Sequence, residues 1–257
     1  MLVAPAVRKL LAPNPSPMTG AGTNTYLVGR GEVLVVDPGP DLPAHLAAIA
    51  EVTMGECIVA ALVSHGHADH LPAAVRLREE HGVPIFGHPG LAAVDRPVAD
   101  GEEIRVGTVC LTVYHTPGHA PDHLCAWNAA DRLLFTGDLI AGEGTVVLSD
   151  ERRALTRYLG SLNRMLALRP ATLLPGHGPP VPNAESHILA YLVHRARREE
   201  QILAALRFGP ATVDALVARL YADTPAALLP MAARNVRAHL ENLEERGLVR
   251  QVGEGWE

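Results

Sequence analysis

The residues best suited to chemistry lie between positions 64 and 70, which read Ser-His-Gly-His-Ala-Asp-His. Imidazoles and carboxylates are rarely buried without partners, so packing alone does not explain this density of polar side chains. In an extended segment His65 and His67 share one side, because side chains alternate with a period of two. Asp69 and His70, at a bend, can then point toward a second ion. The segment predicts a metal site with the ligands His65, His67, Asp69 and His70.

The flanking sequence indicates which elements position these side chains. Residues 58–63 form an apolar run typical of a buried strand, and residues 71–80 show a helical pattern that ends at Gly82. The ligands therefore follow the carboxyl end of a strand, which is where α/β folds place their sites.

Three further candidate ligands follow in the chain, each after a glycine turn. His119 lies in Thr-Pro-Gly-His, Asp138 in Phe-Thr-Gly-Asp and His177 in Leu-Pro-Gly-His-Gly. Any one of these motifs alone is a weak signal, because a His or Asp after a glycine is common. Four ordered motifs, each at the end of a strand-like run, indicate one shared site. The runs before the three later motifs are 109–114, 132–135 and 172–174.

This ordered pattern resembles the metallo-β-lactamase superfamily over most of residues 20–180. The resemblance implies an α/β fold, the αββα sandwich, in which two sheets pack face to face under outer helices. It also implies a dinuclear metal centre in which each metal ion has its own set of ligands. One metal would be held by His65, His67 and His119, the other by Asp69, His70 and His177, and Asp138 would bridge them.

Such a centre implies a metal-dependent hydrolase. Two cations share a hydroxide, because they lower the pKa of bound water from about 15.7 toward 7, and it attacks a carbonyl or a phosphorus. Nitrogen and carboxylate ligands suit two zinc ions, while manganese and iron stay open. Asp69 is also the candidate catalytic residue that orients the hydroxide or accepts its proton, a role that the sequence does not separate from ligation.

Composition is consistent with a cytoplasmic enzyme. The chain has 257 residues, enough for one sizeable core and a small second module. Its three cysteines show no Cys-x-x-Cys spacing, which favours reduced thiols over a disulfide framework. No secretory signal and no apolar stretch of about 18 residues is present, so we expect no membrane segment.

The pattern changes near residue 183, which predicts a hydrolase domain over 1–183 and a second domain over 184–257. The second part reads as three helices followed by a short hairpin, and this order resembles a winged helix. Thr212 is suited to cap the middle helix, and the third helix is expected over 232–246.

Charge disfavours specific binding of duplex DNA by this module. Residues 185–257 carry nine arginines against ten acidic residues, and nucleic-acid affinity depends largely on neutralising phosphates. A packing or substrate-shaping role is favoured over a transcription factor, which would need Arg234 and Arg237. The cluster Arg195, Arg197 and Arg198 is either a solvated helix face or a contact for an anionic substrate.

Three segments resemble a narrower family, the β-lactamase-like protein 2 group: 22–29, 115–119 and 221–225. That group includes a single-strand-specific endoribonuclease and fungal thioesterases that act on carrier-protein-bound polyketides. Relatedness slightly favours a phosphodiester in single-stranded RNA, and an acyl thioester or other small-molecule ester is the alternative. The net charge of −6 opposes RNA.

Other branches fit less well. Common zinc β-lactamases have Cys where Asp138 stands, and glyoxalase II uses lysines, whereas Lys9 is the only lysine here. An intact histidine set disfavours an iron–oxygen redox protein.

His115 and His123 are candidates to orient a ligand imidazole. For Asn24 and Tyr26, turn and core roles are favoured over substrate binding.

Overall fold

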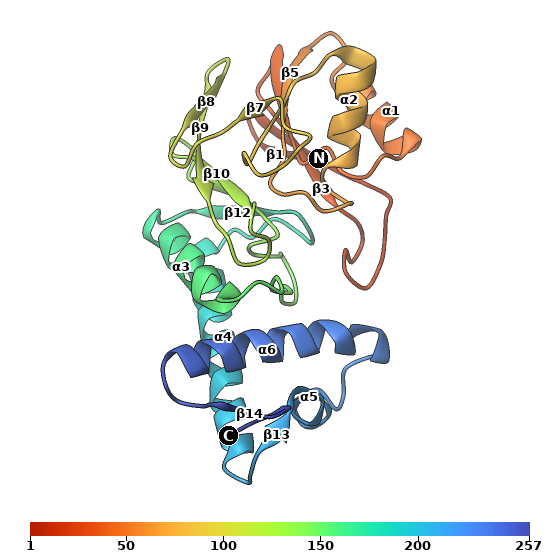
Figure 1. Cartoon of the computed structure of the whole chain (residues 1–257). Helices are drawn as coiled ribbons and strands as arrows, with labels where there is room; N and C mark the ends of the chain where they lie inside the picture. Colours follow the sequence, from red (N-terminus) through yellow and green to blue (C-terminus); the bar gives the residue numbers. More distant parts are fainter.

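Two β-sheets lie face to face in the first two thirds of the chain (Figure 1). The computed structural model describes residues 1–257. The first sheet has seven strands in sequence order, and it is antiparallel up to β4 and parallel from there on. Its strands are β1 (Leu2–Ala4), β2 (Val7–Leu11), β3 (Asn24–Val28), β4 (Glu32–Val36), β5 (Cys57–Leu62), β6 (Ile85–Gly87) and β7 (Arg96–Pro97).

The second sheet has five strands in the order β12-β11-β10-β9-β8, and only the β11–β12 pair is parallel. In β9 the inward residues are Val109, Leu111 and Val113, and their neighbours are partly exposed, as the period of two requires. The strands are β8 (Glu103–Val106), β9 (Val109–His115), β10 (Leu124–Asn128), β11 (Leu133–Gly137) and β12 (Thr172–Pro175).

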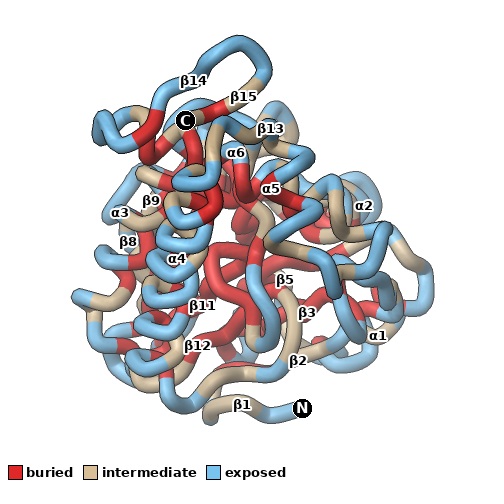
Figure 2. Tube along the Cα trace, turned by 90° about the horizontal axis from the view of Figure 1, so that it is seen from below, coloured by how far each residue is buried: buried red, intermediate tan, exposed pale blue.

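The main core lies between the sheets, and helices cover their outer faces. Figure 2 shows buried strands at the centre and exposed helices around them. Helices α1 (Pro43–Val52) and α2 (Pro72–His81) pack on the first sheet, while α3 (Ala154–Ala167) and the start of α4 (Ala184–Leu206) pack on the second. The αββα arrangement predicted from the sequence is therefore confirmed. No helix combines the length and the hydropathy needed to cross a membrane.

The C-terminal part forms a winged helix, as predicted. The Thr212 hydroxyl accepts a hydrogen bond from the Ala215 amide and caps α5. The third helix starts three residues earlier than expected, because Pro230 occupies a first-turn position that needs no amide hydrogen. The elements after α4 are β13 (Ala211–Thr212), α5 (Val213–Leu220), the 3-10 turn η1 (Ala226–Leu228), α6 (Leu229–Glu245), β14 (Gln251–Val252) and β15 (Gly255–Trp256).

Helix α4 belongs to both parts of the molecule. Its first half places Ile188 and Tyr191 in the core of the second sheet, and its second half places Ile202 and Ala205 in the C-terminal core. In Figure 1 it runs from the sandwich down to the winged helix. A boundary near residue 183 thus stays a prediction, and it falls just before a helix that ties the two cores together.

Helix α6, which would be the recognition helix of a DNA-binding winged helix, faces the first domain instead. The Asn242 amide donates to the Thr156 hydroxyl at 2.9 Å, and Glu245 accepts from the same hydroxyl and pairs with Arg153. Arg234, one of the two arginines considered for DNA, pairs with Asp150. This surface of α6 is therefore occupied by intramolecular contacts.

Candidate metal centre

Four loops at the ends of strands bring the seven sequence-predicted side chains together. His65, His67, Asp69 and His70 follow β5, His119 follows β9, Asp138 directly follows β11 and His177 follows β12. The backbone of Gly118 at φ +144° passes so close to α3 that a Cβ there would lie 2.5 Å from the Tyr158 Cβ. A glycine is therefore required for His119 to reach the site.

One group of side chains is His65, His67, His119 and Asp138, whose ligand atoms lie within 4.8 Å of one another. His65 Nε2 lies 2.8 Å and His119 Nε2 3.0 Å from His67 Nδ1. Three imidazole nitrogens thus converge on one point, with the Asp138 Oδ2 atom 3.5 Å from His119 Nε2. This set of nitrogen and carboxylate donors can hold a metal ion.

The second group is Asp69, His70 and His177, again within 4.8 Å. His177 Nε2 lies 3.1 Å and His70 Nε2 3.4 Å from Asp69 Oδ2. Asp138 stands between the groups, because its Oδ1 is 3.5 Å from His70 Nε2 and its Oδ2 is 3.4 Å from His177 Nε2. The arrangement can hold two ions with Asp138 facing both.

The outward nitrogens of three rings are held by other groups, which sets the direction of each imidazole. His119 Nδ1 lies 2.7 Å from the Val147 carbonyl oxygen, and His177 Nδ1 lies 3.2 Å from that of Gly22. His65 Nδ1 lies 3.0 Å from the Ser64 hydroxyl. Because these contacts occupy one nitrogen, the other is left to face the site.

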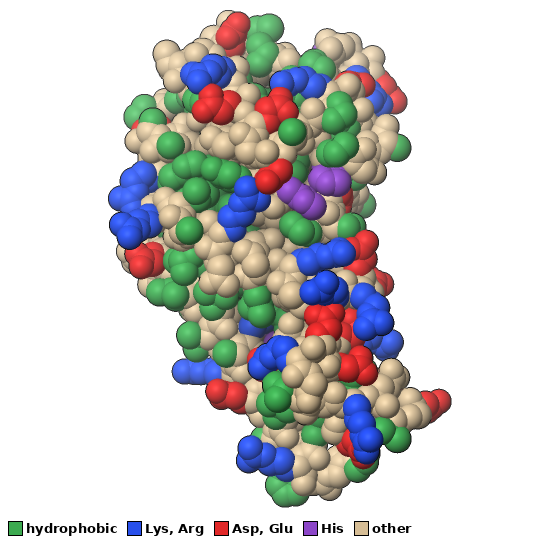
Figure 3. All heavy atoms as spheres, turned by 60° about the vertical axis from the view of Figure 1, so that its left-hand side comes forward, with side chains coloured by type: hydrophobic (Ala, Val, Ile, Leu, Met, Phe, Trp, Pro, Cys, Tyr) green, Lys and Arg blue, Asp and Glu red, His purple; other side chains and the backbone are tan.

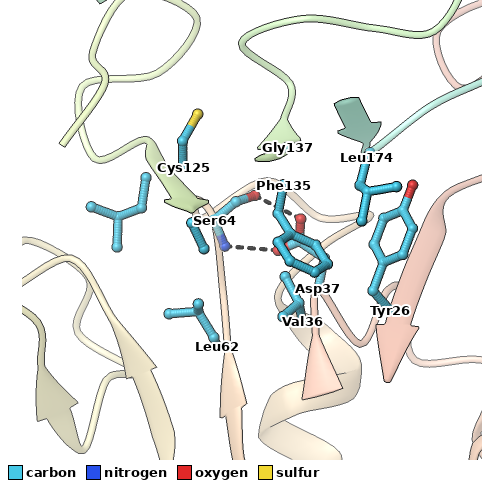
Figure 4. A pocket seen from close by; sticks show the side chains of 12 residues that line it. Tyr26, Val36, Asp37, Leu62, Ser64, Cys125, Phe135, Gly137 and Leu174 are labelled. Carbon is cyan, nitrogen blue, oxygen red and sulfur yellow. Dashed lines mark hydrogen bonds between the residues drawn. The ribbon is translucent and has the colours of Figure 1, made fainter. Parts of the chain in front are cut away.

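Asp37, at the end of β4, is a site residue that the sequence reasoning missed. Its carboxylate accepts hydrogen bonds from the Ser64 amide at 2.7 Å and the Ser64 hydroxyl at 2.8 Å, as Figure 4 shows. Its Oδ2 also lies 3.1 Å from His70 Nδ1. The available signal was a carboxylate before Pro38-Gly39, at the end of a strand, as the predicted ligands are.

The cavity in Figure 4 lies beside the metal centre, between the two sheets. It measures about 10 Å³, the space of a single water molecule, and is lined mainly by apolar side chains such as Phe135 and Leu174. The core under the site is thus closely packed, and the opening to substrate lies on the other side of the ligands.

The remaining polar candidates divide between the site and the scaffold. His123 Nε2 accepts from the Asp138 amide at 3.0 Å, so this ring fixes the ligand loop. His115 lies 2.8 Å from the Pro121 carbonyl oxygen and touches no ligand. The Asn24 amide donates to the carbonyls of Pro175 and Gly178, on either side of His177, and the Tyr26 hydroxyl donates to Pro175.

The electrostatics of the site keep the carboxylates ionised. Burial would raise the pKa of Asp138, but His70 and His177 hold it well below its usual value. Burial would lower the pKa of His70 and His177, but the neighbouring Asp138 carboxylate raises both values. The pKa of His177 is raised to about 10. Burial lowers the pKa of His65. The surplus of negative charge around the second group favours a bound cation.

The donor set fits two metal ions on a further ground. His70 Nε2 and Asp138 Oδ1 are buried, face each other at 3.5 Å and form no hydrogen bond. Buried polar atoms without partners are unfavourable, and a cation between these two atoms would satisfy both. We therefore describe the site as a candidate dinuclear metal centre.

Two clefts open onto the site. The larger, of about 960 Å³, runs between the two domains from His119, Asp138 and His177 to residues of α4, α5 and α6. The smaller, of about 700 Å³, opens on His67 and Asp69 and is bordered by carboxylates. The acidic residues outside the ligand set on its border are Asp122, Asp150 and Glu151.

Comparison with known proteins agrees with this geometry. Residues 18–177 match the family described as the metallo-beta-lactamase superfamily. The chain belongs to the metallo-β-lactamase superfamily. Residues 212–256 match the beta-lactamase associated winged helix domain. The resemblance inferred from the motifs is confirmed, and the chain is a metallo-β-lactamase superfamily hydrolase with a C-terminal winged helix.

The relatives span nearly the whole chain. The beta-lactamase-like protein 2 homolog of Drosophila melanogaster is 35% identical over 268 residues, which cover 95% of this chain and 90% of that protein. The atrochrysone carboxyl ACP thioesterase of Aspergillus chevalieri is 32% identical over 245 residues, 87% of this chain and 75% of that protein. A metallo-beta-lactamase family protein from Thermus thermophilus has the same fold, with a TM-score of 0.83, 24% identity and 99% coverage of both chains.

Proposed function

We propose that this hydrolase cleaves an acyl thioester at a dinuclear centre formed by the seven side chains. The observation that carries the proposal is the interdomain cleft, which leads from the ligands along a largely apolar wall. Such a wall suits an acyl or pantetheine chain better than a polyanion. The Aspergillus relative, named as a carrier-protein thioesterase, supports the same substrate class. The wall residues include Met18, Val146, Val147, Leu220, Leu228 and Met231.

Charge in the smaller cleft, which opens on His67 and Asp69, favours a thioester over RNA, reversing the slight preference that relatedness suggested. The smaller cleft has Asp122, Asp150 and Glu151 on its border. Its one arginine, Arg234, pairs with Asp150, and Glu151 pairs with Arg157, so no unpaired arginine is left there for a phosphate. On the face shown in Figure 3, acidic and basic side chains are interspersed over the C-terminal part. A polyanion would meet carboxylates near the centre. Occupation of α6 by the first domain further disfavours a DNA regulator.

The metals, when bound, supply an activated water and stabilise the charge on the carbonyl oxygen. His65, His67 and His119 would hold one ion, Asp69, His70 and His177 the other, and Asp138 both. Zinc is the proposed metal, because imidazole and carboxylate donors suit it. Metal analysis of the purified protein tests this choice against manganese and iron.

Asp69 is the proposed proton carrier. It is the most exposed carboxylate of the centre, with 27% of its side chain accessible, and the Thr23 hydroxyl donates to its Oδ2 at 3.1 Å. The attacking water gives one proton to the ionised Asp69 carboxylate as its oxygen bonds to the acyl carbon. The carbon–sulfur bond then breaks, and Asp69 returns that proton to the departing sulfur. The products are a carboxylic acid and a thiol.

The test is hydrolysis of a panel of acyl thioesters by zinc-loaded protein, beside an Asp138→Asn variant with its metal content measured. We expect thiol release by the parent protein and a loss of at least about a hundredfold in the variant. End-labelled single-stranded RNA is the second arm. Cleavage of RNA but of no thioester by the parent, lost in the variant, would replace the proposal with a phosphodiesterase.

A further inference from the structure

Two unpaired arginines lie at the end of the interdomain cleft that is remote from the metal centre. Arg198 is on α4 and Arg219 on α5, and both line the cleft that also contains His119 and His177. Neither forms an ion pair, whereas Arg246 and Arg250 in the same domain each pair with a carboxylate. Charged groups in a cleft that lack a partner in the protein are candidates for binding a ligand.

Arg198 is held in place but incompletely satisfied. Its guanidinium lies over the Tyr221 ring, 4.1 Å from the centroid, and its Nη1 donates to the Leu220 carbonyl at 3.1 Å. Its Nε is buried and has no hydrogen-bond partner. Its Nη2 forms no hydrogen bond either. A fixed guanidinium with a free Nη2 is pre-organised for a phosphate or a carboxylate, because little entropy is lost when the anion binds.

Arg219 provides a second positive charge from the neighbouring helix, stacked at 4.8 Å over the Phe208 ring. The cleft also contains exposed carboxylates, those of Glu143 and Asp223, and neither pairs with an arginine. Within the triplet on α4, only Arg198 faces the cleft. Arg195 is buried and donates to the Val146 carbonyl, and Arg197 is exposed and lines neither of the two clefts at the metal centre.

Helix α4 sets the spacing between this anion site and the metal centre. The Tyr191 hydroxyl contacts the backbone of Ala141, three residues after the ligand Asp138. Arg198 lies seven residues further along α4, which corresponds to about 10 Å at 1.5 Å per residue. A ligand that reaches both the metal ligands and Arg198 therefore needs an anion separated from the bond that is cleaved, and the apolar side chains of the same cleft can contact the part between.

We propose that Arg198 and Arg219 bind the phosphate of a phosphopantetheine arm, whose thioester then reaches the metal centre. The inference rests on the proposed thioesterase function and names its substrate class. Phosphopantetheine combines a terminal thioester, a slender amide-containing chain and a phosphate at the far end. Coenzyme A and a carrier protein both present this arm, and the shared phosphate is what the arginines contact.

The kinetic test compares acyl-phosphopantetheine with acyl-pantetheine, which lacks the phosphate, on the zinc-loaded full-length protein. We expect KM to be about tenfold or more lower for the phosphorylated substrate, in line with charged hydrogen bonds. Arg198→Gln keeps a donor for the Leu220 carbonyl. Arg198→Gln and Arg219→Gln should each remove most of the KM difference between the two substrates. Arg197→Gln is the matched control on the same helix and should preserve it.

Acyl-coenzyme A distinguishes the two sources of the arm. A KM equal to that of acyl-phosphopantetheine indicates that only the shared phosphate is bound, which supports the inference for either source. A markedly lower KM supports it with coenzyme A as the source. Equal KM values with and without the phosphate, at measurable turnover, would overturn the inference and leave the thioesterase proposal standing.

Calorimetric binding separates this inference from the proposed function. Phosphopantetheine should bind the zinc-loaded protein at least about tenfold more tightly than pantetheine, and Arg198→Gln should remove most of the difference. If no thioester is hydrolysed but this difference persists, the anion site is retained and the thioesterase proposal fails. Equal binding of the two compounds would refute the site independently of turnover.

Discussion

Asp37 affects the metal centre through its neighbours rather than as a ligand. It is buried, accepts two hydrogen bonds from Ser64 and lies 3.1 Å from the outward nitrogen of His70. An Asp37→Asn substitution keeps the shape but replaces one acceptor oxygen with a donor NH₂. We expect metal affinity to fall about 10–100-fold, because groups behind a ligand set its orientation and basicity. Competition with a chelator of known affinity measures the change.

The control for this prediction is Asp41→Asn, an exposed carboxylate near Arg76 that forms no hydrogen bond or ion pair with a ligand. It should bind metal as the parent does. If Asp37→Asn also retains full affinity, Asp37 has only a packing role, and the orientation of His70 depends on other contacts.

The ligand residues could be predicted from the sequence and their supporting residues could not. The seven candidates are recognisable because each is a His or Asp in a short local motif. Thr23 contacts Asp69 across 46 residues of sequence, and Asp37 contacts Ser64 across 27, so neither contact is visible in a local pattern. Hydroxyls and single carboxylates are too common for local sequence to single them out.

At the scale of elements, the turn before His119 depends on a close approach to helix α3. A Cβ on Gly118 would lie 2.5 Å from Tyr158 Cβ and 2.6 Å from its Cα. These are atoms that cannot move without shifting the helix, and the φ of +144° adds strain for any other residue. Gly118→Ala should lower the free energy of unfolding by about 2–4 kcal/mol, measured by denaturant titration.

Gly160 offers an opposite substitution within α3 itself. It is exposed, and a Cβ there meets nothing within 4 Å. Gly160→Ala should raise the free energy of unfolding by about 0.5–1 kcal/mol, because alanine is the better helix former. Destabilisation of similar size in both variants would show that any change at α3 is unfavourable, and that the close approach of Gly118 to Tyr158 is not the cause.

The contact between α4 and α6 predicts a pH-dependent stability. His239 on α6 is 1% exposed, and neither ring nitrogen has a hydrogen-bond partner. Burial, together with Arg195 and Arg198, lowers its pKa to about 3 in the folded state. Below about pH 6.5 the unfolded chain takes up a proton that the folded chain does not. The free energy of unfolding therefore decreases as the pH is lowered, by up to about 1.4 kcal/mol per pH unit.

A His239→Leu variant removes this one contribution. Urea unfolding at pH 7.5 and pH 5.5 should show a smaller loss of stability in the variant than in the parent, by roughly 1 kcal/mol. His81→Gln, on the exposed end of α2, is the control and should follow the parent. Parallel losses in parent and His239→Leu proteins would contradict the buried neutral imidazole.

Element boundaries illustrate where sequence patterns stop being informative. The cap at Thr212 and the helix stop at Gly82 were predictable because both depend on local hydrogen bonds and backbone angles. The sharing of α4 between two cores was not, because its apolar residues form one continuous pattern. Which half of the helix faces which core depends on tertiary packing alone.

At the scale of the whole molecule, the winged helix supports the metal centre through residues 146–148. The buried Asn235 on α6 accepts from the Leu148 amide at 3.0 Å, and Arg195 on α4 donates to the Val146 carbonyl at 2.8 Å. Between these two positions, the Val147 carbonyl oxygen lies 2.7 Å from the outward nitrogen of His119. The C-terminal domain thus holds, on both sides, the peptide that orients a ligand.

An Asn235→Ala substitution should therefore act on the metal centre from a distance. It leaves the buried Leu148 amide without a partner, which costs about 1–3 kcal/mol of stability. It also loosens the peptide that orients His119, so we expect metal affinity to fall roughly tenfold. Asn235→Asp keeps an acceptor for the amide and should retain most of the affinity. The measurement is metal content after equilibration with a chelator, on the folded protein.

Asn242→Ala separates this link from general loosening of the domain contact. Asn242 lies on the same helix and donates to Thr156 on α3, but it does not touch residues 146–148. Its variant should lose stability and keep its metal affinity. If both alanine variants lose metal equally, docking of the whole domain matters rather than Asn235. If neither does, His119 is oriented without the winged helix, whose role is then confined to forming the cleft.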